Sequence, residues 1–398
     1  MQTSTAKSAA TAAPDADHTL HAGRLGVIGI VFFVIAAAAP LVGMTGALPA
    51  AIVLGNGAAA PGAYLLAGLT LLLFSVGYAA MSHRVTNSGA FFAYIGRGLG
   101  LKMGIGSAFT SLLAYLAIHL SLFGFFGGLM AEQVGALPWW GWSGVAWLAV
   151  TWLSLRSVDV GAGVLGMLLS LELLSLLITA VAIFAQGGPE GVNFAASFNP
   201  SNILTGGLAG SAGIALAFAF ASFIGFEATA IYGEESINPK KTVPLATYVA
   251  VLLITVLFAF TSLAIVTGLG ASQAVDKVVA MTTVDGAPLA NPSAVVFGLA
   301  ASYVGEWLAS TMKVLVLSSL FAGLLAFQNS AARYLFALGR GGTLPARLGL
   351  VNERGAPVNG SLTVSVITLI VIALFALGGL DPVLNMFFWF SGLAVISI

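Results

Sequence analysis

Long apolar runs alternate with short polar segments along most of the chain. A helix needs about 20 apolar residues to cross the hydrocarbon core of a bilayer, whereas barrel strands alternate apolar and polar positions over about 10 residues. The runs here are continuous and longer than a barrel strand, so the fold class predicted is an all-α integral membrane protein. The pattern predicts ten spans, at about residues 25–54, 62–81, 103–130, 139–155, 160–185, 207–233, 243–268, 312–338, 359–378 and 383–398.

The two ends of the chain differ from the rest. Residues 1–24 are mainly small and polar, which predicts a disordered cytoplasmic tail ahead of a membrane domain over 25–398. A cleavable signal peptide around VFFVIAAAAP is the alternative, but the apolar stretch continues to Leu54 and nine spans follow. The last predicted span stops at residue 398 without a polar flank, so we expect the sequence to be truncated within this span.

The composition supports a membrane location. Hydrophobic residues make up 59% of the 398 residues and charged residues 7%, against about 25% charged in a typical soluble domain. Such a chain cannot cover a water-facing surface, which excludes a soluble enzyme. Because 14 Lys and Arg balance 14 Asp and Glu, a nucleic-acid binder is also excluded. There is no cysteine, and hence no disulfide or thiolate chemistry.

The basic residues predict the orientation, since loops on the cytoplasmic side carry an excess of Lys and Arg. With a cytoplasmic N-terminus, twelve of the fourteen basic residues fall on the inner side, and only Lys277 and Lys313 do not. The twelve are Lys7, Arg24, Arg84, Arg97, Lys102, Arg156, Lys240, Lys241, Arg333, Arg340, Arg347 and Arg354. We therefore expect a multi-pass protein of the cell membrane with its N-terminus inside.

Two of the predicted spans contain helix-breaking residues. Span one holds AAAAPLVGMTGALPAA, in which Pro40 and Pro49 lack a backbone donor and two glycines weaken the helix. Span six holds SFIGFEATA, where Gly225 lies close to Glu227. The two spans have the same position in two sets of five, a pattern typical of the central site of a transporter. Helix packing is the alternative, because glycine and proline are common in membrane helices.

Three segments resemble signatures of the amino acid–polyamine–organocation (APC) superfamily. They are FASFIGFEATAIYGEESINPKKTVPLA in span six, NSAARYLFALGRGGTLPARL after span eight, and RVTNSGAFFAYIGRGLG between spans two and three. The resemblance covers about residues 20–398. It implies a five-plus-five inverted repeat of the leucine-transporter type, with repeat one at 25–185, repeat two at 207–398 and broken spans one and six. It also implies a secondary active transporter of amino acids or related small amines. Because permeases of this superfamily usually have twelve spans, the resemblance also implies that the chain is C-terminally incomplete.

A zwitterionic amino acid at the two breaks needs donors for its carboxylate and acceptors for its ammonium group. Amide groups at the start of a half-helix in span one supply the donors, at Val42, Gly43, Met44, Thr45 and Gly46. Unwound carbonyls in span six supply the acceptors, around Ala221, Ser222 and Ile224. The resemblance implies the same assignment, although Val42-Gly43-Met44 replaces the Gly-Ser-Gly common in the family. Phe220 and Phe223 lie near the span-six break and either cover the substrate or pack in the core.

Two acidic residues are predicted deep in the membrane. Glu172 lies in LLSLELLSLLI, about 18 Å along span five at 1.5 Å per residue. A charge at this depth costs about 2.5–3.5 kcal/mol, so burial favours the protonated form and such residues usually mark function. We predict that Glu172 or Glu227 takes up a coupled proton, with His119 as the next candidate. The alternatives are structural: Glu172 bonded to span one or eight, and Glu227 stabilising its helix. In some proton-coupled relatives a lysine occupies the span-five position, which leaves proton and sodium coupling open.

The sequence contains neither HExxH nor GxxxxGK[ST], and its four histidines do not cluster. We therefore expect no metal, no cofactor and no enzymatic activity; the expected partners are an amino acid or amine, a proton and the lipid bilayer, with no nucleic acid. A neutral substrate is preferred because few acidic residues accompany Glu227. The alternatives are an amino-acid exchanger, a non-transporting nutrient sensor on the same fold, a channel, or an intramembrane enzyme.

Overall fold

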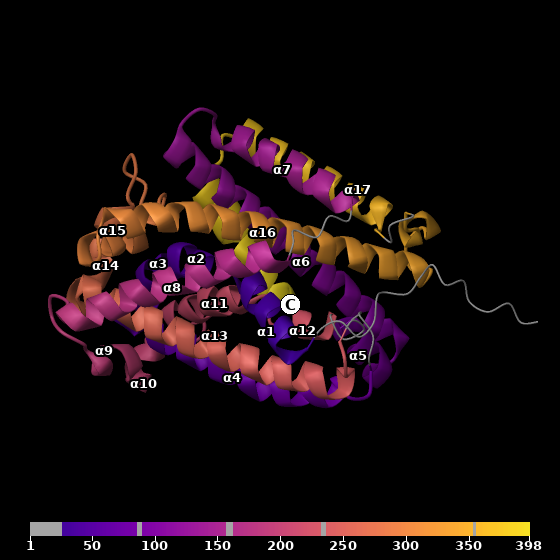
Figure 1. Cartoon of the computed structure of the whole chain (residues 1–398), viewed down its shortest axis with the longest axis horizontal. Helices are drawn as coiled ribbons and strands as arrows, with labels where there is room; N and C mark the ends of the chain where they lie inside the picture. The colour runs from indigo at the N-terminus through magenta and orange to yellow at the C-terminus, as the bar shows by residue number, and fades with distance from the viewer. Residues whose placement is uncertain (1–25, 86–89, 157–161, 232–235, 353–355) are drawn as a thin grey trace, which may run out of the picture.

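The computed structural model describes residues 26–85, 90–156, 162–231, 236–352 and 356–398. The tail predicted over 1–24 lies outside them. In the described residues the chain forms helices and turns, and an isolated bridge joins Val284 and Ala287. The long helices run alongside one another in a single bundle (Figure 1). The all-α prediction is confirmed.

Helices coincide with all ten predicted spans. Seven long, nearly unbroken ones are α4 (Ala60–Ser82), α6 (Leu101–Val134), α7 (Trp139–Leu155), α8 (Ala162–Gln186), α13 (Pro239–Leu269), α16 (Glu306–Arg340) and α17 (Val358–Leu377). A second set of seven is defined by length and apolar composition: within the described residues, seven helical segments could cross a membrane. This set includes Val27–Ser82, which contains predicted spans one and two, and Ser211–Ala230 of span six. The shorter α7 and the segment Pro382–Ser397 correspond to predicted spans four and ten. The chain is therefore a multi-pass membrane protein.

Short helices connect the spans at the two ends of the bundle. At the left end of Figure 1 lie α9 (Phe194–Phe198), α10 (Pro200–Ile203), α14 (Ala274–Thr282) and α15 (Ala294–Tyr303). At the right lies α5 (Ala90–Leu99), which carries Arg97 and packs on the start of α6. Single turns of 3₁₀ helix are η4 (Gly57–Ala59), η6 (Ala271–Gln273) and η7 (Ala346–Gly349).

Span one breaks at a single residue. Helix α1 (Val27–Ala38) ends at Ala39, which has a left-handed backbone (φ 44°, ψ 68°), and Pro40 begins the next helix. Proline disfavours the right-handed α conformation at the residue before it and suits the first turn of a helix, so the break falls directly before Pro40. The second half of the span then continues through α2 (Pro40–Val42), η2 (Gly43–Ala47), α3 (Leu48–Ala50) and η3 (Ala51–Asn56). The glycines of this stretch, which we expected to weaken the helix until it unwinds, lie instead in wide, π-type helical turns.

Span six breaks over a longer stretch. Helix α11 (Ser211–Phe223) ends at Ile224, and α12 (Ala228–Ile231) begins after Glu227. Gly225 lies between them with φ +113°, and a Cβ there would come within 2.9 Å of the Ala37 side chain. Only glycine therefore fits at this point of the chain.

The two broken spans lie side by side and antiparallel. A Cβ built at Gly55 would contact Ala215, one at Gly43 would contact Ser222, and one at Gly225 would contact Ala37. Residue numbers therefore increase along span one in the direction in which they decrease along span six. The two breaks come to the same level of the bundle.

The other helices surround this pair. Helix α13 packs along α4, while α6 contacts α16, η8 (Pro382–Phe387) and α18 (Phe388–Ser397). Helices α7 and α17 pack on each other and cover α6 and α16 from above in Figure 1. This order accommodates two sets of five spans, each beginning with a broken span; their inverted symmetry stays a prediction.

Candidate functional site

A cavity lies between the two breaks. Its walls come from both broken spans and from α6, α16, η8 and α18. The lining residues are Ala37, Ala38, Ala39, Val42, Gly43, Ala47, Ile118, Leu122, Phe218, Ala221, Ser222, Ile224, Phe327, Phe387 and Ser391. Ligand sites in membrane transporters lie at broken helices, because a break exposes backbone groups within the bundle.

Half of the predicted substrate-binding residues line this cavity. They are Val42, Gly43, Ala221, Ser222 and Ile224. The other five, Met44, Thr45, Gly46, Phe220 and Phe223, are not among its lining residues. Helical geometry explains the division, since consecutive residues of a helix point in different directions and only one face meets the cavity.

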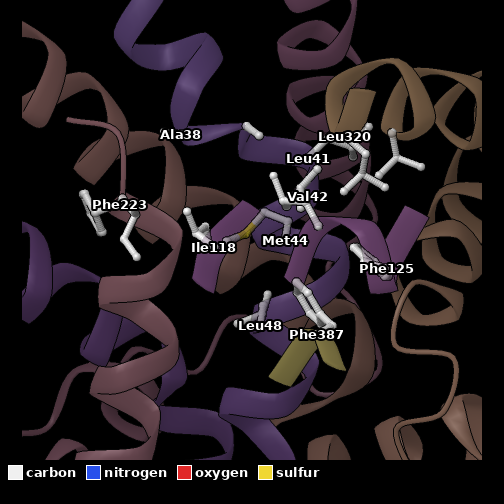
Figure 2. Close-up of a cluster of buried hydrophobic side chains, with 14 of the residues drawn as sticks. Ala38, Leu41, Val42, Met44, Leu48, Ile118, Phe125, Phe223, Leu320 and Phe387 are labelled. Atoms are coloured by element: carbon white, nitrogen blue, oxygen red, sulfur yellow. The ribbon is translucent and has the colours of Figure 1, made fainter. Parts of the chain in front are cut away.

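The five remaining residues have other neighbours. Met44 and Thr45 are fully buried, and the Thr45 hydroxyl donates to the Leu41 carbonyl at 2.7 Å. Gly46 faces the rings of Phe125 and Phe387. Figure 2 shows Met44 and Leu48 in the buried cluster around these two rings.

The two predicted aromatic residues of span six also differ from each other. Phe223 is fully buried and contacts Phe258 edge to face, with ring centroids 5.3 Å apart. Phe220 is half-buried and packs against the main core. The core-packing alternative therefore describes Phe223.

Ser222 links the break of span six to span two. Its hydroxyl lies 3.1 Å from the Tyr64 hydroxyl and donates to the Phe218 carbonyl at 3.0 Å. The same side chain lies against Gly43 of span one, where an added Cβ would come within 3.2 Å of it. Ser222 thus holds the two breaks close together.

Most of the apolar wall was not predicted from the sequence. Ile118, Leu122, Phe218, Phe327 and Phe387 lie within ordinary apolar runs on four different helices. Nothing in a hydrophobic run distinguishes a residue that faces a cavity from one that faces another helix. Only the packing of these helices brings the five side chains together.

Glu172 holds the start of the second half of span one. Its Oε1 atom accepts the backbone N–H of Leu41 at 2.8 Å and the hydroxyl of Ser319, on α16, at 3.1 Å. The side chain is 4% exposed. The sequence left open whether Glu172 bonds to span one or to span eight, and in the structure it bonds to both. Because the first amides of a helix have no partner within it, the carboxylate caps this half-helix.

Glu227 performs a similar task in span six. Its Oε2 atom accepts the Gly225 N–H at 2.9 Å, and its Oε1 atom accepts the Tyr115 hydroxyl, on α6, at 3.0 Å. The Tyr78 hydroxyl donates to its backbone carbonyl at 2.7 Å. Glu227 is fully buried. Through these hydrogen bonds it joins the broken segment of span six to spans two and three.

His119 lies on α6 outside the cavity. It is fully buried against Phe123, and neither ring nitrogen has a hydrogen-bond partner among the described residues. The neighbouring Gln328 side chain donates instead to Ser361 O and Ser365 Oγ, each at 2.9 Å, and so joins α16 to α17.

The geometry suits a small ligand with both a carboxylate and an ammonium group. Helix α11 ends at the cavity, where the Ala221 carbonyl accepts the Ile224 N–H at 3.3 Å and keeps a second lone pair. The helix that begins at Pro40 brings the amide of Val42 to the cavity, between the Leu41 N–H bonded to Glu172 and the Gly43 N–H bonded to the Ala39 carbonyl. The two ends carry opposite partial charges. In the described part of the chain, no three His, Asp or Glu side chains gather as metal ligands would.

Comparison with known proteins assigns the family. The model of the amino acid permease family matches residues 29–398. The branched-chain amino acid permease BcaP of Lactococcus lactis is 28% identical over 78% of this chain and 67% of its own length. The cationic amino acid transporter 3, mitochondrial, of Arabidopsis thaliana is 26% identical over 76% and 50%. The putrescine transporter PotE of Haemophilus influenzae is 25% identical over 69% and 57%. Because the family model matches nearly the whole length of this chain, the chain belongs to the amino acid permease family.

Proposed function

We propose that this permease takes up an amino acid or a related small amine together with a proton, by alternating access around the cavity between spans one and six. One observation carries the proposal: the two helix breaks lie at one level and face a single buried cavity. A site at the contact of two broken spans is reached from either side when one part of the bundle tilts against the other.

The helix ends supply the recognition chemistry. The substrate carboxylate binds near the amide of Val42, in the first turn after Pro40, because the N–H of Leu41 is bonded to Glu172 and that of Gly43 to the Ala39 carbonyl. Its ammonium group binds the carbonyls near Ala221 and Ser222, at the end of α11. Both groups then meet a favourable helix dipole.

Glu172 and Glu227 supply candidates for the coupled proton. Each is buried, and each accepts a hydrogen bond from a backbone N–H group at or near a break, Leu41 for Glu172 and Gly225 for Glu227. Burial favours the neutral form of a carboxyl group, and protonation weakens the bonds that a carboxylate accepts. A proton on either residue therefore loosens the attachment of one broken half-helix. We propose the orientation with a cytoplasmic N-terminus in the cell membrane, on the distribution of basic residues.

The test uses full-length protein in proteoliposomes. Uptake of labelled alanine, leucine, arginine and putrescine is measured with and without an imposed pH gradient, and exchange is measured by counterflow. We expect gradient-driven accumulation in the wild type, reduced at least tenfold in Glu172→Gln or Glu227→Gln while counterflow is retained. Glu306→Gln, at the exposed start of α16, is the matched control.

Each alternative has its own result. Counterflow without gradient-driven accumulation in the wild type identifies an exchanger. Substrate binding without any flux identifies a sensor. Wild-type pH dependence in both glutamine variants refutes coupling through these two residues.

A further inference from the structure

We propose that the cavity selects neutral amino acids with an apolar side chain of intermediate size, such as valine or leucine, and that Phe387 sets the size limit. The inference rests on the proposed substrate site and adds the substrate class. The relatives do not decide the class, because their names include branched-chain, cationic and diamine substrates.

The lining of the cavity excludes a second charge on the substrate. Among the described residues that line it, the polar side chains are Ser222 and Ser391, and none is charged. Glu172 and Glu227 are not lining residues, and they bind amide and hydroxyl donors elsewhere. The second cationic group, a guanidinium in arginine or an ammonium in a diamine, would be buried without a partner, which is strongly unfavourable.

The helix ends also decide where the side chain of the substrate points. The carboxylate and ammonium groups occupy the two breaks, so the rest of the molecule extends toward the opposite wall. That wall consists of Ile118 and Leu122 from α6, Phe327 from α16 and Phe387 from η8. All four are apolar, as a pocket for an aliphatic side chain requires.

Phe387 closes one part of this wall because Gly46 leaves room for it. A Cβ at Gly46 would lie 2.7 Å from the Cζ atom of Phe387 and 3.0 Å from the Cε1 atom of Phe125. The two phenylalanine rings are stacked, with centroids 4.6 Å apart and planes at 23°. Figure 2 shows these rings close together. The ring of Phe387 is thus held between Gly46, Phe125 and the cavity, and the cavity can extend here only if the ring is removed.

Two substitutions should shift the size limit in opposite directions. Phe387→Leu removes the ring and lengthens the cavity. Gly46→Ala places a methyl group where the Phe387 ring lies; since Phe125 covers one face of that ring, we expect it to shift into the cavity and shorten it. Phe375→Leu is the matched control, because Phe375 packs against Phe390 and does not line the cavity.

The experiment measures uptake of labelled valine into proteoliposomes in competition with unlabelled alanine, valine, leucine, phenylalanine, arginine and putrescine. In the wild type we expect valine and leucine to compete at least tenfold better than arginine or putrescine. We expect Phe387→Leu to raise the ratio of phenylalanine to valine affinity tenfold or more, and Gly46→Ala to lower the ratio of leucine to alanine affinity tenfold or more. Phe375→Leu should change neither ratio.

Three results would overturn the inference: arginine or putrescine competing as well as valine, unchanged ratios in Phe387→Leu, or equal changes in Phe375→Leu. Should Gly46→Ala fail to fold, Phe387→Leu and the wild-type panel still decide the matter. The failure of this inference differs from that of the proposed function. A cationic substrate refutes selectivity alone, whereas the absence of binding by every compound refutes the transport site.

Discussion

Replacing Gly43 by leucine tests whether the cavity between the breaks is the substrate site. Gly43 lines the cavity, and a Cβ built there would lie 3.2 Å from both Cβ and Oγ of Ser222 and 3.4 Å from Cζ of Phe258. The first added carbon already touches span six. The three further carbons of leucine must then enter the cavity, where the substrate is proposed to bind.

The size of the effect follows from these distances. In Gly43→Ala the neighbours must move by a few tenths of an ångström, which lowers the stability of the fold by about 1 kcal/mol or less, and we expect binding to weaken by no more than about fivefold. In Gly43→Leu, overpacking costs about 1–3 kcal/mol even where the structure yields, and the side chain also occupies the space of the ligand. We expect binding to weaken by about 100-fold or more.

The assay is binding and counterflow by purified protein whose folding is checked by size-exclusion chromatography. Gly392→Leu is the matched control, because it makes the same change in α18 where an added Cβ meets nothing within 4 Å. We expect this control to bind substrate as the wild type does. A folded Gly43→Leu protein with wild-type affinity would refute the site, and the break in span one would then serve packing alone.

Three further predictions concern stability and topology. Glu172→Leu leaves the buried N–H of Leu41 without its acceptor and should lower the free energy of unfolding by about 1–3 kcal/mol, measured in urea or thermal unfolding. Glu172→Gln keeps an acceptor oxygen and should cost less. Equal losses in the two variants would contradict the capping role. Tyr64→Phe removes a bond to Ser222 and should cost about 1 kcal/mol, a loss that should shrink when it is measured in Ser222→Ala. Reporters fused in the segments 82–102, 234–242 and 339–358 should all report the cytoplasm, and a signal from the other side at any of them would overturn the orientation.

The positions of the spans were predictable because a membrane imposes a strict length and composition on a helix. Helix α7 spans Trp139–Leu155, the same residues as the predicted fourth span, and α17 differs from the prediction by one residue at each end. The breaks in spans one and six were predictable for a similar reason, since proline and glycine act on the backbone of their own segment. Local chemistry sufficed for these features.

The exact form of the first break was less predictable. Proline and two glycines lie within seven residues of one another, and each weakens a helix. The structure shows that Pro40 interrupts the helix at Ala39 while Gly43 and Gly46 remain helical. Contacts with Ser222 and Phe387 fill the space beside these glycines, so tertiary packing keeps them in the helix.

The sequence by itself determined the membrane fold, the order of the spans, the two breaks and the acidic residues deep within the bundle. These depend on the backbone and on the cost of burying charge, which act locally. Only the tertiary structure decided that Glu172 caps the half-helix at Leu41, that Glu227 joins spans two, three and six, and that Phe387 closes the cavity over Gly46. Each of these contacts joins residues far apart in the chain. The sequence of a hydrophobic run does not show which face of the helix packs against another helix.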